Sequence, residues 1–257
     1  MYEKSRSFAR ALLQMNLKKD NVGCVFLPNM PEMPIAFLGM LEVGLIPSPV
    51  NPIGTSGIKN SIRYGSVFFS LIPSTSYSKN GILDELAKQV NGSKAKFIIT
   101  IPSLLETVRA AQKKAATLEH IIIVSDEAYE GCHSFFEMLK VDNKGTNYLK
   151  GSDIDAETQV ALLPFSSGTT GLPKGVMLST SNICTNIAQY CQPGYYPPLS
   201  FENGREQERF IGVLPFFHIY GFSLTMASSL YLGCHTVCVP KFDPDVFVNT
   251  IQQHKVD

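Results

Sequence analysis

Apolar and polar positions in the first 160 residues follow two alternating patterns. Apolar residues recur at helical spacing in several segments, namely 3–16, 33–43, 86–90, 102–115 and 134–140. Short continuous apolar runs, typical of buried parallel strands, lie between them at 22–27, 45–50, 95–100 and 120–125. Strands and helices that alternate in this way predict a parallel sheet with helices on both faces. We therefore expect a doubly wound α/β fold.

The rest of the chain carries apolar runs separated by polar loops. A buried strand is expected at 160–165, a second apolar run follows at 176–178, and a helix is predicted at 182–190, capped by Ser179 or Ser181. The apolar stretch 211–233 approaches the length of a membrane span. Pro215 and Gly221 interrupt it, so we predict a strand, a loop and a buried helix there, and no transmembrane segment.

Composition narrows the class of partner. The formal net charge is zero and no run of basic residues is present, so nothing favours nucleic acid or an anionic membrane surface. The six cysteines lack the spacing of a small disulfide scaffold, which indicates a reduced, intracellular chain. Residues 1–20 are charged and amphipathic and do not resemble a signal peptide. Composition indicates no oligomeric state.

A loop rich in glycine and hydroxyl groups follows the predicted strand at 160–165. Ten positions hold three glycines, four hydroxyl side chains and one lysine. Glycines allow backbone N–H groups to approach an anion, hydroxyls donate to phosphate oxygens, and a lysine adds positive charge. A plain surface turn is the alternative. We interpret the loop as a phosphate site whose candidate residues are Ser166, Ser167, Gly168, Thr169, Thr170, Gly171 and Lys174. It is not a Walker A loop, because Lys174 lies between a proline and a glycine.

A second motif, at 213–221, reads Val-Leu-Pro-Phe-Phe-His-Ile-Tyr-Gly. Aromatic and apolar residues with a few polar groups are the usual lining of a small-molecule pocket, and a glycine permits a turn. A histidine packed among core aromatics is the alternative. Downstream, Cys234, His235 and Cys238 do not predict a zinc site, because neighbouring strand residues point to opposite faces and no second ligand pair exists.

These motifs resemble those of the adenylate-forming, AMP-binding enzymes. Ser-Ser-Gly-Thr-Thr-Gly-Leu-Pro-Lys-Gly-Val at 166–176 is similar to their signature. The motif at 213–221 resembles the acyl-site motif of the branch that contains acyl-CoA synthetases, 4-coumarate–CoA ligases and luciferases. Pro-Lys-Phe-Asp at 240–243, Leu-Pro-Asn at 27–29 and Val-Asn-Pro at 50–52 are also similar to family segments. Thr180-Ser181 departs from the family, many of whose members carry a histidine there.

The resemblance implies a reaction and a role for each motif. Members activate a carboxylic acid with ATP and Mg²⁺ to an acyl-adenylate, and transfer the acyl group to coenzyme A. The loop of Ser166 to Lys174 would hold the phosphates, His218, Tyr220 and Gly221 would border the carboxylate and the acyl-adenylate, and Lys241 would lie near coenzyme A. No metal ligand is identified with certainty. His218 is not expected to act as a base, because an ionised carboxylate has no proton to lose.

The resemblance extends over residues 1–257 and implies an incomplete large N-terminal domain. Residues 56–82 interrupt the family pattern between Thr55 and Leu83, so we interpret them as an insertion or an unspliced segment. The printed residues lack the Tyr-Gly-x-Thr-Glu and Thr-Gly-Asp motifs that hold adenine, magnesium and ribose in the family. We therefore expect this chain alone to be inactive. A luciferase-like or other adenylating enzyme and a non-catalytic nucleotide-binding protein remain alternatives. The expected location is cytoplasmic or peroxisomal, and the carboxylic acid is not indicated.

Overall fold

A computed structural model of the chain describes residues 1–52, 63–64, 67–68, 79–166, 173–192 and 207–256. Its centre is a five-stranded sheet in the order β2-β1-β5-β6-β7, in which every neighbouring pair is parallel. The strands are β1 (Val22–Val25), β2 (Ile46–Pro49), β5 (Phe97–Thr100), β6 (His120–Ile123) and β7 (His133–Ser134). The strands predicted from the apolar runs are confirmed, as is the parallel α/β fold.

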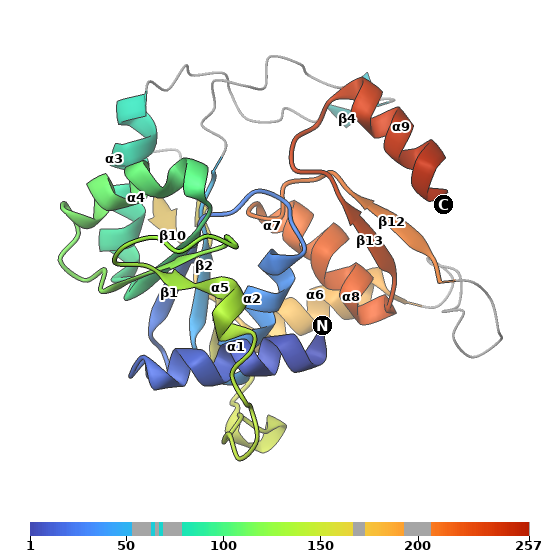
Figure 1. Ribbon diagram of the computed structural model, residues 1–257. Helices are drawn as coiled ribbons and strands as arrows, with labels where there is room; N and C mark the ends of the chain where they lie inside the picture. The colour runs from blue at the N-terminus through green and yellow to red at the C-terminus, as the bar shows by residue number, and fades with distance from the viewer. Residues whose placement is uncertain (53–62, 65–66, 69–78, 167–172, 193–206, 257) are drawn as a thin grey trace.

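Helices cover both faces of this sheet (Figure 1). One face packs against α1 (Tyr2–Gln14), α2 (Glu32–Glu42) and α5 (Phe135–Met138). The other packs against α3 (Lys79–Ser93) and α4 (Leu105–Gln112), the latter preceded by a 3-10 turn at Pro102–Leu104. Successive side chains of a strand point to opposite faces, so Phe97 and Ile99 enter the first core and Ile98 the second. Both faces are buried, which explains why the strands are continuous apolar runs.

Helix α3 begins earlier than its apolar spacing indicated. It starts at Lys79, about two turns before Leu86, and Ile82 and Leu83 extend the apolar face by about one turn because they pack against the same core as Leu86. Inside the segment 56–82, β3 (Arg63–Tyr64) and β4 (Val67–Phe68) form a short antiparallel pair. The end of the interval at 82 therefore lies within a helix rather than at an element boundary.

The strand expected at 160–165 is two short strands, β8 (Val160–Leu162) and β9 (Phe165–Ser166). Pro164 has no N–H to donate to a ladder, and the Leu163 N–H donates instead to the Pro47 carbonyl (3.0 Å). In the apolar run at 176–178, Val176 and Met177 are exposed, Met177 at 73%, whereas Leu178 is half-buried and packs against the core. The run connects β10 (Lys174–Gly175) to β11 (Leu178–Ser179), which pairs with β8 in antiparallel fashion.

Helix α6 (Thr180–Tyr190) follows β11 and confirms the predicted cap. The Ser179 hydroxyl accepts a hydrogen bond from the Asn182 backbone N–H (3.2 Å), and the side-chain Oδ1 of Asn182 accepts one from the Ser179 backbone N–H (3.0 Å). Two orphan donors of the first turn are thereby satisfied.

The last described segment forms a second parallel pair, β12 (Arg209–Gly212) and β13 (His235–Cys238). Between them lie α7 (Ile219–Gly221), a π-helix at Phe222–Ala227, and α8 (Ser228–Leu232). The chain continues into α9 (Pro244–His254), capped by Asp243 and lying at the periphery beside β12 (Figure 1). The predicted strand, loop and buried helix are confirmed. Among the residues described, no helix combines the length and apolar character that crossing a bilayer demands.

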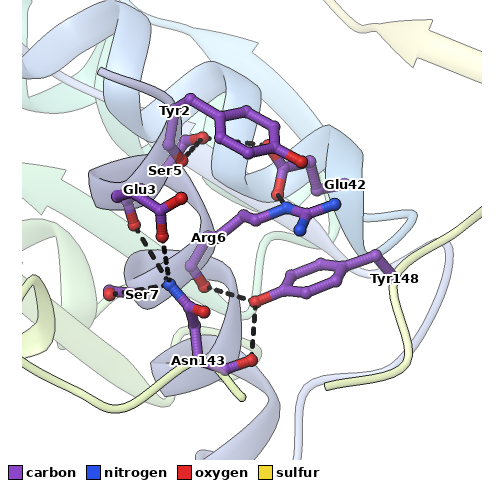
Figure 2. Close-up of polar contacts among 8 residues, drawn as sticks. All are labelled: Tyr2, Glu3, Ser5, Arg6, Ser7, Glu42, Asn143 and Tyr148. Carbon is purple, nitrogen blue, oxygen red and sulfur yellow. Dashed lines mark hydrogen bonds and ion pairs between the residues drawn. The ribbon is translucent and has the colours of Figure 1, made fainter. Parts of the chain in front are cut away.

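A polar cluster joins α1, α2 and the segment after α5 (Figure 2). The Arg6 guanidinium lies 4.4 Å from the ring centres of both Tyr2 and Tyr148, and its Nε is 3.8 Å from a carboxylate oxygen of Glu42. The Ser5 hydroxyl donates to the other Glu42 oxygen (2.9 Å). Burial raises the pKa of the Glu42 carboxyl, while Ser5 and Arg6 oppose that rise. The cluster holds α1 on α2 and contains none of the candidate site residues.

Candidate active site

The two ends of the predicted phosphate loop meet in a short hairpin. β9 pairs with β10 in antiparallel fashion, with Lys174 opposite Ser166 and Gly175 opposite Phe165. The side chains of Ser166 and Lys174 are both exposed. The five other candidates, Ser167, Gly168, Thr169, Thr170 and Gly171, lie outside the described residues. The structure thus brings the first and last members of the motif together at the base of the loop.

A buried hydrogen-bond chain attaches this hairpin to the end of β2. The Ser48 hydroxyl donates to the Leu163 carbonyl (2.8 Å). The Gln89 side-chain amide of α3 donates to the Ser48 hydroxyl (3.0 Å) and to the Pro49 carbonyl (2.8 Å). Buried polar groups with satisfied partners position the backbone strongly, so the loop starts from a rigid base. Sequence analysis assigned no role to Ser48 or Gln89, because neither lies within a recognised motif.

The second motif divides its side chains between core and surface. Phe216 is buried at 1% exposure, whereas His218 and Tyr220 are exposed. The backbone turns back on itself, with the His218 N–H donating to the Pro215 carbonyl (3.0 Å). His218 therefore begins α7 as its N-cap, and its Nδ1 accepts a hydrogen bond from the Tyr220 N–H (3.2 Å).

Gly221 is required for space rather than for a turn conformation, which corrects the expectation from sequence. Its φ is −68°, a value that any residue adopts in a helix. A Cβ at this position would lie 2.2 Å from the carbonyl oxygen of Pro215 and 2.9 Å from that of Leu214. The glycine allows the start of α7 to pack directly on the backbone that precedes His218.

Burial favours the neutral form of the His218 ring. Partial burial lowers the pKa of the imidazole, although one side of the residue stays open to solvent. Because Nδ1 accepts a hydrogen bond, the ring proton of the neutral form belongs on Nε2. In that neutral form the imidazole can donate a hydrogen bond from Nε2 without carrying a charge.

We expect His218 to titrate below the ordinary histidine value when its ring carbons are followed by NMR between pH 8 and 5. The folded-state pKa is depressed, so this group's contribution to stability is fully present above the unfolded value near 6.5 and is lost as the pH falls below it. His218→Asn keeps an acceptor for the Tyr220 N–H and removes the titration. This variant should lose less stability than wild type between pH 7 and 5. His133, whose pKa is also lowered by burial, contributes a loss of the same sign in both proteins. An unchanged slope in the variant would contradict the assignment.

Asn29 joins the second motif to the central sheet. It follows β1, is 1% exposed, and its amide nitrogen donates to the carbonyls of Gly212 (3.0 Å) and Leu214 (2.8 Å). Its amide oxygen accepts from the Phe216 N–H (2.8 Å). Sequence analysis used Asn29 only as part of the Leu-Pro-Asn segment and gave it no function.

The two motifs therefore attach to adjacent strands at one edge of the sheet. The hairpin is held at the carboxyl end of β2, and the 213–221 segment at the carboxyl end of β1. In open α/β sheets, ligands bind outside the carboxyl ends of the strands. Lys241 lies on the exposed turn between β13 and the Asp243 cap, and no described contact joins it to either motif. Among the described residues, no group of three or more His, Cys, Asp or Glu side chains is placed to hold a metal ion.

Comparison with known proteins identifies the class. The model of the AMP-binding enzyme family matches residues 1–257, so the chain belongs to that family. It is 32% identical to 4-coumarate–CoA ligase 2 of Petroselinum crispum over 254 residues, which cover 98% of this chain and 39% of the relative. It is 34% identical to probable 4-coumarate–CoA ligase 1 of Dictyostelium discoideum over 249 residues, covering 96% of this chain and 41% of the relative. The chain thus spans about two fifths of the length of these relatives.

Solved structures agree on the fold. A red-emitting luciferase from Phrixothrix hirtus superposes with a TM-score of 0.77 at 22% identity, covering 99% of this chain and 54% of the luciferase. The anthranilate–CoA ligase AuaEII, solved with anthranoyl-AMP, superposes with a TM-score of 0.74 at 18% identity, covering 99% and 42%. The adenylate-forming α/β fold predicted from the motifs is confirmed.

Proposed function

We propose that this chain is part of the large domain of an ATP-dependent acid–thiol ligase. The observation that supports this most is that the Ser166–Lys174 hairpin and the His218 segment are tied to the carboxyl ends of adjacent strands. That placement allows one nucleotide and one carboxylate to meet over a single sheet edge. Identity of about 30% to 4-coumarate–CoA ligases favours an aryl or acyl carboxylate as substrate.

The reaction has two balanced steps. A carboxylate oxygen forms a bond to the α-phosphorus of ATP, and the bond from that phosphorus to the bridging oxygen of the β-phosphate breaks, which releases pyrophosphate. The thiolate of coenzyme A then attacks the acyl carbon and AMP leaves. Neither the attacking carboxylate nor the departing pyrophosphate requires a proton, so catalysis depends on orientation and charge stabilisation.

Each motif has a role in this scheme. Lys174 and Ser166, with the intervening Ser167, Gly168, Thr169, Thr170 and Gly171, hold the departing pyrophosphate, where Mg²⁺ accompanies ATP. Neutral His218 and Tyr220 border the carboxylate, with Gly221 keeping that wall close. Lys241 contacts coenzyme A. The resemblance of the motifs supports all of these assignments, and the attachment of the two segments to the sheet supports those of the loop and of the His218 segment.

We further propose that residues 1–257 form part of one domain, with 56–82 as an insertion or unspliced segment, and that the protein acts in the cytoplasm or peroxisome. The sequence of the mature transcript tests the interval: codons for 56–82 in that message would contradict an unspliced segment. Because α3 begins at Lys79 and Ile82 packs against the core, a deletion of 56–82 should be compared with one that spares residues 79–82.

Exchange of pyrophosphate into ATP, measured with a panel of aromatic and fatty acids, tests the activity. The 257-residue chain alone should show none, because its sequence lacks the family's adenine and ribose motifs. The protein encoded by the whole mature transcript should show carboxylate-dependent exchange of pyrophosphate into ATP. It should then release AMP only when coenzyme A is present. Exchange without a requirement for coenzyme A would favour a luciferase-like or other adenylating enzyme. ATP binding without exchange would favour a non-catalytic nucleotide-binding protein.

Lys174→Ala should weaken binding of magnesium pyrophosphate to this chain by about 10-fold, which corresponds to about 1.4 kcal/mol. Lys174 is the cation at the base of the loop, opposite Ser166, and its loss removes a charge-assisted contact to phosphate oxygens. Calorimetric titration measures the affinity. Lys4→Ala, which removes the same charge from the exposed face of α1, is the control and should leave the affinity unchanged. Equal affinities for both variants would contradict the role of Lys174.

A further inference from the structure

The buried Asn29 side chain makes three hydrogen bonds to the 212–216 segment, using both of its donors and one acceptor position. Two carbonyls accept from its amide nitrogen and one N–H donates to its amide oxygen, at 2.8–3.0 Å. This partner set determines the orientation of the amide, since a flipped group would face two carbonyls with an oxygen. The partners are 183 to 187 residues away along the chain.

The three bonds tie the 212–216 segment to the loop that follows β1. β12 and β13 form a sheet of their own and do not extend the five-stranded sheet. Phe216 inserts into the core beside α2, but apolar packing alone is non-directional and leaves the backbone free to slide. Directional bonds to Gly212, Leu214 and Phe216 fix both the position of the 212–216 backbone relative to β1 and its orientation.

The held residues lead directly into the candidate carboxylate site. Phe216 is bonded to Asn29, and His218 begins α7 two residues later. The Tyr220 N–H then bonds to His218 Nδ1, so the position of the Phe216 backbone carries over to both exposed side chains.

We propose that Asn29 is a positioning residue that sets the register of the 212–216 backbone against β1, and through it the orientation of His218 and Tyr220. The consequence for substrate binding rests on the proposed function, whereas the positioning itself does not. Asn29 contacts no reacting atom. It connects the carboxyl end of the sheet, where the Ser166–Lys174 hairpin is attached, to the segment that carries His218 and Tyr220.

Two substitutions separate positioning from general stability. Asn29→Ala removes all three bonds. Asn29→Asp keeps the acceptor for Phe216 but places carboxylate oxygens against the carbonyls of Gly212 and Leu214, and burial and repulsion raise the pKa of such a group. When protonated, the acid regains one donor. Gln89→Ala is the matched control, because Gln89 is a buried amide with two hydrogen bonds on the opposite face of the sheet.

Hydrogen exchange of the 257-residue chain supplies the readout, with rates normalised to intrinsic values and to the amides of β5 and β6. Asn29→Ala should increase exchange of the Phe216, Tyr220 and Phe222 amides at least 10-fold relative to that sheet reference. In Gln89→Ala, exchange of these three amides and of the β5 and β6 amides should change by the same factor. Asn29→Asp should exchange faster at these three amides at pH 8 than at pH 5, relative to wild type at the same pH, because only the protonated acid regains a donor. Wild type measured at both pH values corrects for titration of His218.

Several outcomes would overturn the proposal. These are equal normalised exchange in Asn29→Ala and Gln89→Ala, no difference between pH 5 and pH 8 in Asn29→Asp, or unfolding of both Asn29 variants at every pH. In an extended, active protein, Asn29→Ala should raise the KM for the carboxylate more than that for ATP. If the extended protein shows no exchange of pyrophosphate into ATP, that result would count against the proposed function alone and leave the hydrogen-exchange result on positioning intact.

Discussion

Gly221→Ala is expected to lower the free energy of unfolding by about 3 kcal/mol, near the upper end for overpacked sites. The added Cβ would lie 2.2 Å from the Pro215 carbonyl oxygen and 2.6 Å from its carbon, and neither atom is the flexible end of a side chain. Relief requires α7 to move away from the segment that carries His218. Urea unfolding followed by far-UV circular dichroism measures the loss.

The control for this substitution is Gly151→Ala, in a surface 3-10 turn where nothing lies within 4 Å of the added Cβ. It should change stability by less than about 0.5 kcal/mol, as surface substitutions commonly do. The His218 ring resonances should also shift in Gly221→Ala, since α7 must move, and should stay in place in the control. A Gly221→Ala protein as stable as wild type would show that the close approach at Pro215 is not needed.

Gly23→Ala is expected to be about as damaging, by about 2–4 kcal/mol, for a different reason. Gly23 of β1 is paired in register with Phe97 of β5, and the Phe97 ring lies across it. An added Cβ would meet three ring carbons at 2.2 to 2.6 Å. Phe97 is fully buried in the core between the sheet and α1, so the ring cannot leave.

The clash at Gly23 involves a side chain, so it should be repairable. Phe97→Leu alone should lose about 1–2 kcal/mol by leaving a cavity. The double variant Gly23→Ala, Phe97→Leu should lose less than the sum of the two single changes, because the smaller side chain makes room for the Cβ. Thermal and urea unfolding of the four proteins give the coupling energy. A coupling of zero would mean that the ring and the glycine do not share the same space.

Local patterns predicted most of the first 160 residues. Continuous apolar runs located β1, β2, β5 and β6, because a strand buried on both faces needs apolar side chains at every position. Helical spacing located α1, α2 and α4, because a helix that packs on a sheet buries one face and repeats its apolar side chains every three to four residues. The phosphate motif and the motif at 213–221 were recognised from residue types alone, and the family match confirms the class that they indicated.

The patterns failed where a distant partner decided the outcome. The run at 160–165 breaks at Pro164, since the Leu163 N–H finds the Pro47 carbonyl more than a hundred residues earlier. Gly221 matched a turn signal by its identity, but the structure requires it for contact with Pro215.

By itself the sequence determined the α/β class, the order of the elements and the two motifs. The spacing of apolar residues and the residue types in a motif are local properties that do not depend on distant parts of the chain. Only the tertiary structure decided that both motifs attach to the carboxyl ends of β1 and β2. It also assigned positions to Asn29, Ser48 and Gln89, whose hydrogen bonds join segments 40 to 187 residues apart. A buried amide with partners at such separations leaves no periodic trace in the sequence, since its neighbours are chosen by packing.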